Sequence, residues 1–151
     1  MAVTQKCQYA LRALFELARR SGDGPISAGG IAERQAIPKR FLEVILHQLR
    51  QGGFVDSQRG KDGGFYLSRP AEAVTVGEII RFMDGPIRPV DCHRERPVTM
   101  CPLRGVCVFH DLWEAAGKAL EQVYDTRTLG DLVLEEKRRL ERPAGEPPSV
   151  I

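Results

Sequence analysis

Three of the four cysteines in this chain of 151 residues stand close together, in a stretch rich in proline and arginine. Their spacing is Cys92-x8-Cys101-x5-Cys107, and His110 follows Cys107 after two intervening residues. Soft thiolates gathered in one loop suit zinc or an iron–sulfur cluster. A histidine one helical turn after a cysteine can face the same metal centre. The spacing therefore makes Cys92, Cys101, Cys107 and His110 candidate metal ligands.

The expected compartment favours metal binding over disulfide formation. The chain shows no charged region followed by a long apolar stretch at its start, and no segment approaches the apolar length of a membrane span. We therefore expect a cytoplasmic protein with no membrane partner, whose thiols stay reduced. The fourth cysteine, Cys7, falls within the first expected helix, and we expect it to be a buried core residue.

A zinc finger is the alternative from a different functional class. Fingers of the pattern Cys-x8-Cys-x5-Cys-x3-His bind single-stranded RNA, and the present spacing differs from that pattern by one residue. Zinc supplies the folding free energy of such a finger, so that little scaffold is needed. A CCCH-like RNA-binding protein would leave the helices on both sides of the loop unexplained. An enzyme is not expected, because we find neither a phosphate-binding glycine motif nor a plausible nucleophile–base set.

Hydrophobic periodicity predicts the elements that position this loop. The stretches 54–58 and 65–69 resemble the two strands of a β-hairpin around a glycine-rich turn. Helical spacing of apolar residues covers 4–20, 27–35, 38–51, 76–84 and 108–124, and a further helix starts near residue 128. Helix, helix, short turn, helix, hairpin is the order of a winged helix-turn-helix. We predict a mainly α fold with a small β-hairpin wing and a long C-terminal dimerisation helix.

Four segments follow from these elements. Residues 1–84 are expected to form a winged helix-turn-helix DNA-binding domain with its following helix, and 85–107 a cysteine-rich loop that binds the cluster. Residues 108–142 would hold the dimerisation helix and a C-terminal helix, and 143–151 a disordered tail rich in proline. The apolar face of 108–124, which includes Trp113, is too wide for one small domain to bury, so we expect a homodimer.

Charge is distributed unevenly along the chain. Residues 1–70 hold 11 Lys and Arg against 6 Asp and Glu, whereas residues 71–151 hold 11 against 14. A basic first half suits a lobe that contacts phosphates. The partner that this charge and the helix-turn-helix order favour is double-stranded DNA.

Five residues are candidate DNA contacts. Lys39 and Arg40 lie in the first turn of the third expected helix, the part of a recognition helix that enters the major groove. Glu43, one turn further, can accept a hydrogen bond from a cytosine amino group. Arg59 and Lys61 flank a glycine at the expected hairpin tip, where an arginine suits a narrow, negative minor groove.

Three stretches together resemble the IscR/NsrR family of winged-helix regulators. They are TQKCQYALRAL, IAERQAIPKRFLEVILHQLRQGGFVDSQRGKDGGF and VTVGEIIRFMDG. The resemblance spans roughly residues 2–136. It implies a homodimer that pairs through the helix 108–124 and binds a palindromic operator with its helix-turn-helix and wing.

The resemblance also implies roles for particular residues. Cys92, Cys101 and Cys107 match the three loop cysteines that ligate iron in the cluster-binding branch of the family. His110 matches the histidine that IscR-like members add after the last cysteine. Arg59 matches the wing arginine that enters the minor groove. In the recognition helix, the glutamate that influences operator choice corresponds to position 43.

Two positions depart from the family pattern. The first cysteine gap, x8, is longer than the x5 of IscR- and NsrR-type proteins, which leaves the cluster type open between [2Fe-2S], which we favour, and [4Fe-4S]. Gln8 stands where the nitric-oxide-sensing branch carries a carboxylate ligand. We predict a DNA-binding repressor whose operator binding is controlled by an iron–sulfur cluster that senses iron, redox or nitric oxide status. The same regulator with zinc or a thiol switch in the loop is the alternative.

Overall fold

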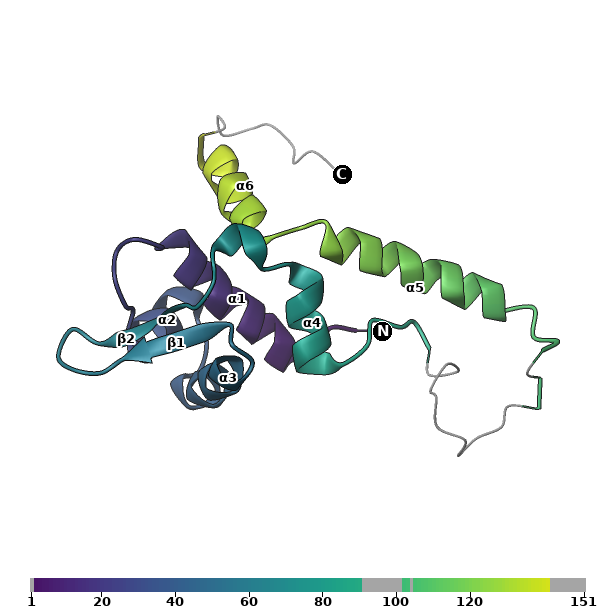
Figure 1. The fold of residues 1–151 in the computed structure, drawn as a ribbon, viewed down its shortest axis with the longest axis horizontal. Coiled ribbons are helices and arrows are strands. Elements are labelled where there is room, and N and C mark those ends of the chain that lie inside the picture. Colours follow the sequence, from purple (N-terminus) through teal and green to yellow (C-terminus); the bar gives the residue numbers. More distant parts are fainter. Residues whose placement is uncertain (1, 91–101, 104, 142–151) are drawn as a thin grey trace.

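The computed structural model describes residues 2–90, 102–103 and 105–141 of the chain. Its elements follow one another as α1 (Gln5–Arg19), α2 (Ala28–Gln35), α3 (Lys39–Gln51), β1 (Val55–Gln58), β2 (Gly64–Leu67), the short 3₁₀ helix η1 (Ala71–Ala73), α4 (Val76–Asp84), α5 (His110–Asp125) and α6 (Leu129–Glu141). Helices α1 to α4, α6 and the hairpin form a body, from which α5 extends to one side (Figure 1). The predicted mainly α fold with a small hairpin is confirmed.

Helix α1 lies at the centre of the body. It begins where the hydroxyl of Thr4 accepts a hydrogen bond from the backbone N–H of Cys7, at 3.2 Å. Its apolar residues, several of them alanines, let α2, α3, α4 and α6 pack closely around it. The largest fully buried apolar side chains are Leu14, Ile31, Leu42, Leu46, Leu49, Ile79, Ile80, Ile87, Leu129, Val55 and Val74. This core holds the helix-turn-helix as one rigid unit.

The turn between α2 and α3 orients the helix that is expected to read DNA. Ser27 caps α2 by accepting from the N–H of Gly30 at 3.1 Å. Ala36 then adopts a left-handed conformation, with φ of 48°, and buried Ile37 fixes the turn against the core. Since Pro38 cannot donate a backbone hydrogen bond, it suits the start of α3.

The wing is held to the body by a third short pairing. Strands β1 and β2 are antiparallel, with Val55 opposite Leu67 and Gln58 opposite Gly64. Ile26 adds to the outer edge of β2 by exchanging two backbone hydrogen bonds with Phe65, at 2.9 and 2.8 Å. Any side chain at Gly64 would collide with the backbone of Ile26. A glycine is therefore required where the wing meets the loop before α2.

A threonine followed three residues later by a carboxylate predicts a capped helix start at Thr75 and at Thr128, and the structure confirms the second pairing and corrects the first. Thr128 and Asp131 form a reciprocal capping box at the start of α6, with bonds of 2.9 and 3.1 Å. At α4 the hydroxyl of Thr75 caps the N–H of Glu78, as expected. The carboxylate of Glu78, however, pairs with Arg69 at 2.6 Å, so the expected reciprocal bond is replaced by a tertiary one.

Helix α5 is joined to α4 by side-chain hydrogen bonds near its C-terminal end. Arg81 of α4 makes two hydrogen bonds of 2.7 Å with Asp125. Backbone hydrogen bonds on each side of Thr75 join the start of α4 to the loop between α5 and α6. Among the residues of α5, all of which the structure describes, none is buried. We call α5 the arm: its last turns are bonded to α4, while its first turns lie beyond the body (Figure 1). The expected tail 143–151 lies outside the described residues.

A buried carboxylate joins three helices of the body. Glu16 of α1 is inaccessible to solvent and accepts hydrogen bonds from Arg19 at 2.8 Å, Gln35 at 2.9 Å and Arg34 at 3.4 Å. Arg19 in turn pairs with Glu136 of α6 at 3.3 Å. Burial raises the pKa of the Glu16 carboxyl, but the hydrogen bonds from Gln35 and Arg19 and the charge of Arg19 outweigh it and leave the pKa below its ordinary value.

We expect Glu16→Gln to lower the free energy of unfolding by about 1–3 kcal/mol at pH 7, because two guanidinium groups lose their charged acceptor. A pKa that is lowered in the folded state stabilises the protein above the unfolded pKa, and this stabilisation is lost as pH falls through the folded pKa. The gap between wild type and Glu16→Gln should therefore stay constant down to about pH 4.5 and shrink below it. Urea denaturation followed by circular dichroism measures it. A gap that widens on acidification would contradict this assignment.

Candidate nucleic-acid interface and cysteine loop

The three candidate residues on α3 lie on its exposed side. Lys39, Arg40 and Glu43 are all exposed, in the first turns after the helix-turn-helix turn. Lys39 and Glu43 form an exposed ion pair of 4.0 Å, which contributes little to stability. No hydrogen bond or ion pair joins the side chain of Arg40 to the rest of the described chain. These side chains are therefore available to an external partner.

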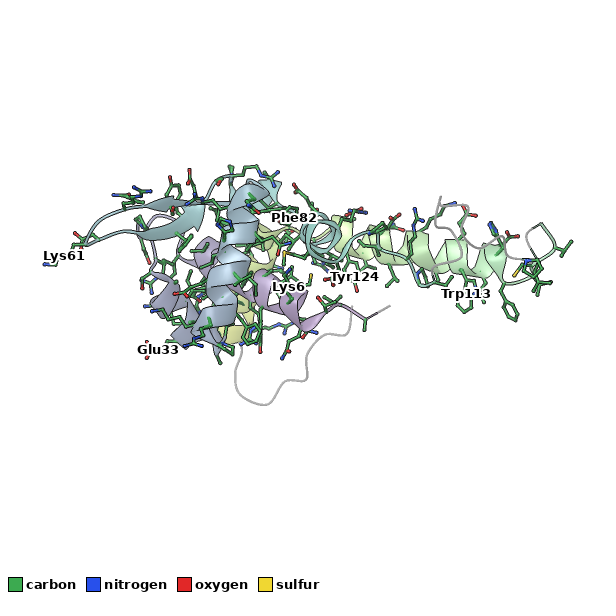
Figure 2. All side chains as sticks on the ribbon, turned by 90° about the horizontal axis from the view of Figure 1, so that it is seen from below. Lys6, Glu33, Lys61, Phe82, Trp113 and Tyr124 are labelled. Carbon is green, nitrogen blue, oxygen red and sulfur yellow. The ribbon has the colours of Figure 1, made fainter. Side chains whose placement is uncertain are left out.

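The wing presents two further cations at its tip. Arg59 and Lys61 are exposed in the turn between β1 and β2, and Lys61 marks the far end of the hairpin in Figure 2. Gly60 between them has a φ of 115°, which a residue with a side chain rarely adopts. The turn is closed by the N–H of Gly63, which donates to the carbonyl of Gly60 at 3.1 Å.

Short contacts fix the wing relative to α3. Arg50, near the end of α3, donates to the hydroxyl of Ser57 in β1 at 3.0 Å. The N–H of Phe54 donates to the carbonyl of Leu49 at 3.0 Å, and Phe54 is buried. The helix and the hairpin therefore form one surface with a set spacing, as a reader of adjacent grooves requires.

The described part of the cysteine loop meets the N-terminal end of α5. Cys107 is partly buried, and its carbonyl accepts from the N–H of His110, the first residue of α5, at 3.2 Å. This places Cys107 and His110 one turn apart, as their spacing predicts. Nδ1 of His110 lies 3.1 Å from the carboxylate of Asp111. The two other expected ligands, Cys92 and Cys101, lie outside the described residues.

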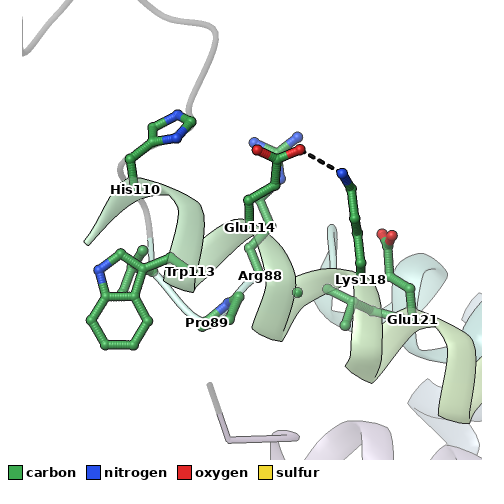
Figure 3. Close-up of a pocket in the computed structure, with 10 residues that line it drawn as sticks. Arg88, Pro89, His110, Trp113, Glu114, Lys118 and Glu121 are labelled. Carbon is green, nitrogen blue, oxygen red and sulfur yellow. Dashed lines mark hydrogen bonds and ion pairs between the residues drawn. The ribbon is translucent and has the colours of Figure 1, made fainter. Parts of the chain in front are cut away.

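A groove of about 350 Å³ runs beside this end of α5. It lies between the segment 87–90 and one side of the helix, and Figure 3 shows His110, Glu114 and Lys118 following one another along α5. His110, Asp111 and Glu114 bring their ligand atoms within 4.8 Å of one another. Lys118, however, donates to Glu114 at 2.6 Å, and this hydrogen bond is the main cause of the lowered pKa of Glu114.

Asp111 is the residue near the candidate metal centre that sequence reasoning missed. A carboxylate bonded to one ring nitrogen commonly orients a histidine that binds metal through the other nitrogen. The signal was present in the sequence as a carboxylate directly after the last candidate ligand. An adjacent residue is easy to overlook because residues one apart on a helix generally point to different sides.

Cys7 lies in the core of the body. It is fully buried beside Ile80 and Ile87, as expected of a core cysteine. Desolvation, with the negative charge of Asp84 and a hydrogen bond to it, raises the pKa of the Cys7 thiol to about 12. A thiol held protonated in this way is a poor metal ligand and a poor nucleophile.

Comparison with known proteins identifies the family. The Rrf2 family, described as iron-dependent transcriptional regulators, matches residues 3–135. The chain belongs to the Rrf2 family. It is 34% identical to the protein rrf2 of Nitratidesulfovibrio vulgaris over 133 residues, which are 88% of this chain and 87% of that protein. It is 35% identical to the regulator IscR of Klebsiella pneumoniae over 133 residues, covering 88% and 80% of the two chains.

Solved structures of Rrf2 proteins share the fold. The global cysteine regulator CymR of B. subtilis matches with a TM-score of 0.75 and 33% identity, over 89% of this chain and 98% of that one. IscR of T. potens matches with a TM-score of 0.74 and 32% identity, over 96% and 94%. The predicted resemblance and the winged-helix fold are confirmed. Members of this family bind DNA as transcriptional regulators and are not enzymes, so both of these expectations hold for this chain.

The same comparisons support a DNA-binding fold but do not identify the signal that the protein senses. Relatives of similar identity carry the names IscR and CymR, and CymR of B. subtilis is described as a global cysteine regulator. Family membership alone therefore does not assign an iron–sulfur cluster. Within the part of the chain that the structure covers, no helix is both long and apolar enough to cross a membrane.

The exposed wing cations generate a prediction about DNA binding. Arg59→Ala should weaken operator binding by about 1–3 kcal/mol if Arg59 reads base edges or groove shape. Lys61→Ala should weaken all duplexes more evenly and reduce the salt slope of binding by about one unit. Fluorescence anisotropy over a range of salt concentrations measures both effects, with Lys137→Ala in α6 as a matched control that should change neither. Unchanged affinity in Arg59→Ala would remove the wing from the interface.

Proposed function

We propose that this Rrf2 regulator binds a palindromic operator as a homodimer, with an affinity set by an iron–sulfur cluster that Cys92, Cys101, Cys107 and His110 hold. The observation that carries the proposal is the position of Cys107 and His110 at the start of α5, the one helix of the described chain that lies mostly away from the body. Anything that binds these residues acts directly on the arm.

The donor set of the described ligands fits such a cluster. Cys107 offers a partly accessible thiol, and His110 an exposed imidazole backed by Asp111. A bound cluster, for which we favour [2Fe-2S], supplies a redox-active centre that is sensitive to iron supply. The chain's own contribution is to hold the ligands at the junction of loop and arm. Zinc or a thiol switch at the same residues is the alternative. The similarity to CymR, which is described as a cysteine regulator, supports this alternative.

The DNA side of the proposal uses the exposed face described above. Lys39 and Arg40 would contact phosphates or base edges at the start of α3, and Glu43 would accept from a cytosine amino group after leaving its weak ion pair with Lys39. Arg59 would enter the minor groove, and Lys61 would contact phosphate. Because α3 and the wing are held on the same core, their side chains can bind adjacent grooves of one duplex together.

A seam along α5 supports the homodimer. Phe109, Leu112, Ala116, Ala119 and Val123 recur at spacings of three and four, the pattern of a coiled-coil interface. Most of them are exposed, whereas Leu120 and Tyr124 on the neighbouring side pack against the body. The two alanines would let paired helices approach closely. A second copy of the arm would cover this apolar seam.

Cluster and DNA binding would be coupled through this arm. Ligation would tie the loop to the start of α5, and paired arms set the distance between the two DNA-reading bodies. A coupling of about 1–3 kcal/mol would change operator affinity roughly 5- to 150-fold. The body has its own core, so loss of the ligands should leave it folded.

We expect Cys101→Ala to abolish the cluster and to bind the operator with the affinity of apo-protein, because a required ligand is missing. Cys7→Ala, which removes a buried thiol away from the loop, is the control and should keep its iron. His110→Ala should lose iron less completely. Anaerobic purification with an absorption spectrum and iron and sulfide assays comes first, because zinc would leave the protein colourless.

Titration of a labelled operator then compares holo-protein, apo-protein and Cys101→Ala. Equal affinities for all three would show that the cluster is not the switch at that operator. In parallel, genomic fragments are selected with the holo form and with the apo form, which identifies operators that bind one form more tightly than the other. If both selections returned the same sites with the same affinities, the sensor proposal would be wrong.

The seam predicts the assembly state. Leu112→Asp should convert a micromolar dimer to a monomer in sedimentation equilibrium, because it places a charge in the paired seam. Leu134→Asp on α6 is the matched control, since Leu134 is 52% exposed against 56% for Leu112, and it should remain dimeric. A wild-type monomer at micromolar concentration would rule out the homodimer.

A further inference from the structure

The exposed face of α3 carries two large apolar side chains beside its charges. Phe41 is 65% exposed and Val44 is 64% exposed, although the other large apolar residues of this helix are buried. Val44 stands three positions after Phe41, so the two side chains are neighbours on the helix surface. Arg40 lies one turn before Val44, and Glu43 lies directly before it. We call Phe41 and Val44 the α3 apolar patch.

The α3 apolar patch has no partner within the described chain. The hydrophobic core reaches α3 from its other side, through Leu42, Ile45 and Leu46. The arm with its apolar seam leaves the body on the side away from the wing (Figure 1). Val44 is β-branched and lowers the helix propensity of α3, and at an exposed position this cost is not offset by packing in the core. The patch therefore suits an external apolar group.

The surrounding charge indicates what that group belongs to. Lys39 and Arg40 precede the patch, and Arg59 and Lys61 of the wing extend from the same body. This cationic setting favours a polyanion over an apolar protein surface. In the major groove of DNA, the apolar group that base edges present is the C5 methyl of thymine. A methyl contact needs no hydrogen-bonding partner, which agrees with the chemistry of valine and phenylalanine.

We propose that the α3 apolar patch reads thymine, with Val44 and Phe41 packing against its C5 methyl group. The inference rests on the proposed entry of α3 into the major groove and adds a specificity determinant to it. Arg40 and Glu43 offer hydrogen bonds that suit G·C pairs, so the patch would add a preference for A·T pairs within the same half-site.

Deoxyuridine tests the inference, because it differs from thymidine only by the missing methyl group. A duplex is first selected from a random library with wild-type protein, and each thymine is then replaced singly by deoxyuridine. At one or two positions in each half-site, replacement should weaken wild-type binding about 3- to 5-fold, the factor expected for burial of one methyl group. Anisotropy titrations measure it.

The variants give the decisive comparison. Val44→Ala should bind the selected duplex more weakly and should no longer respond to deoxyuridine at one of those positions, and Phe41→Ala should behave alike. Leu140→Ala, which removes an exposed apolar side chain from α6, should keep the full wild-type response. Because all three side chains are exposed, the variants should fold as wild type does, which circular dichroism checks.

Two results would overturn the inference, and a further variant separates it from the proposed function. If no deoxyuridine duplex binds wild type more weakly, or if Val44→Ala and Phe41→Ala keep the full response, the patch does not read thymine. If Arg40→Ala in the same titrations loses affinity, α3 still contacts DNA and only the thymine inference fails. If Arg40→Ala and the patch variants all bind as wild type does, the entry of α3 into the groove fails too.

Discussion

The paired hydrogen bonds between Arg81 and Asp125 determine how the arm leaves the body. Both side chains are partly exposed, so the ion pair contributes little to stability, but its two-point geometry fixes direction. The hydrogen bond from Arg81 lowers the pKa of Asp125, and the same bond raises that of Arg81, so the pair stays charged. A side chain at Gly77 would occupy the place of the Asp125 carboxylate. The exposed seam and the start of α5, with Cys107 and His110, lie beyond this joint.

The proposed mechanism follows from placing two functions at opposite ends of one rigid body. The wing and α3 lie at one end, and the first turns of α5 at the other (Figure 1). In the proposed mechanism, a change at the loop need not rearrange the core of either body, which is close-packed. It can act through the relative placement of two bodies in a dimer. This division also explains how relatives named IscR and CymR share one fold while their names point to different regulation.

Local signals in the sequence predicted most of the fold. Thr4, Pro38 and the Thr128–Asp131 pair act within one turn of the chain, and each lies at the helix start that its residue type indicates. Tertiary contacts were not predictable, such as the hydrogen bond between Glu78 and Arg69. The 3₁₀ helix Ala71–Ala73 was not predicted either, because it is too short to show a hydrophobic period. Glu16 gave a partial signal, as a charge on the apolar face of α1. For the candidate site, spacing predicted that Cys107 and His110 lie together, and the width of the apolar face of 108–124 predicted that part of it is left exposed. The structure was needed to show which residues of that face pack on the body, because periodicity alone does not distinguish them.

The central claim is that occupancy of the loop changes the spacing of the two DNA-reading bodies. A spin label introduced at Glu33, an exposed position on α2, through an unnatural amino acid would report that spacing by pulsed electron paramagnetic resonance without touching the cysteines. Measured anaerobically, the dimer should give one distance distribution with the cluster and a shifted or broader one without it, and the holo distance should suit half-sites separated by whole turns of about 34 Å. The same distribution in both forms, or no dipolar signal at all, would contradict the account.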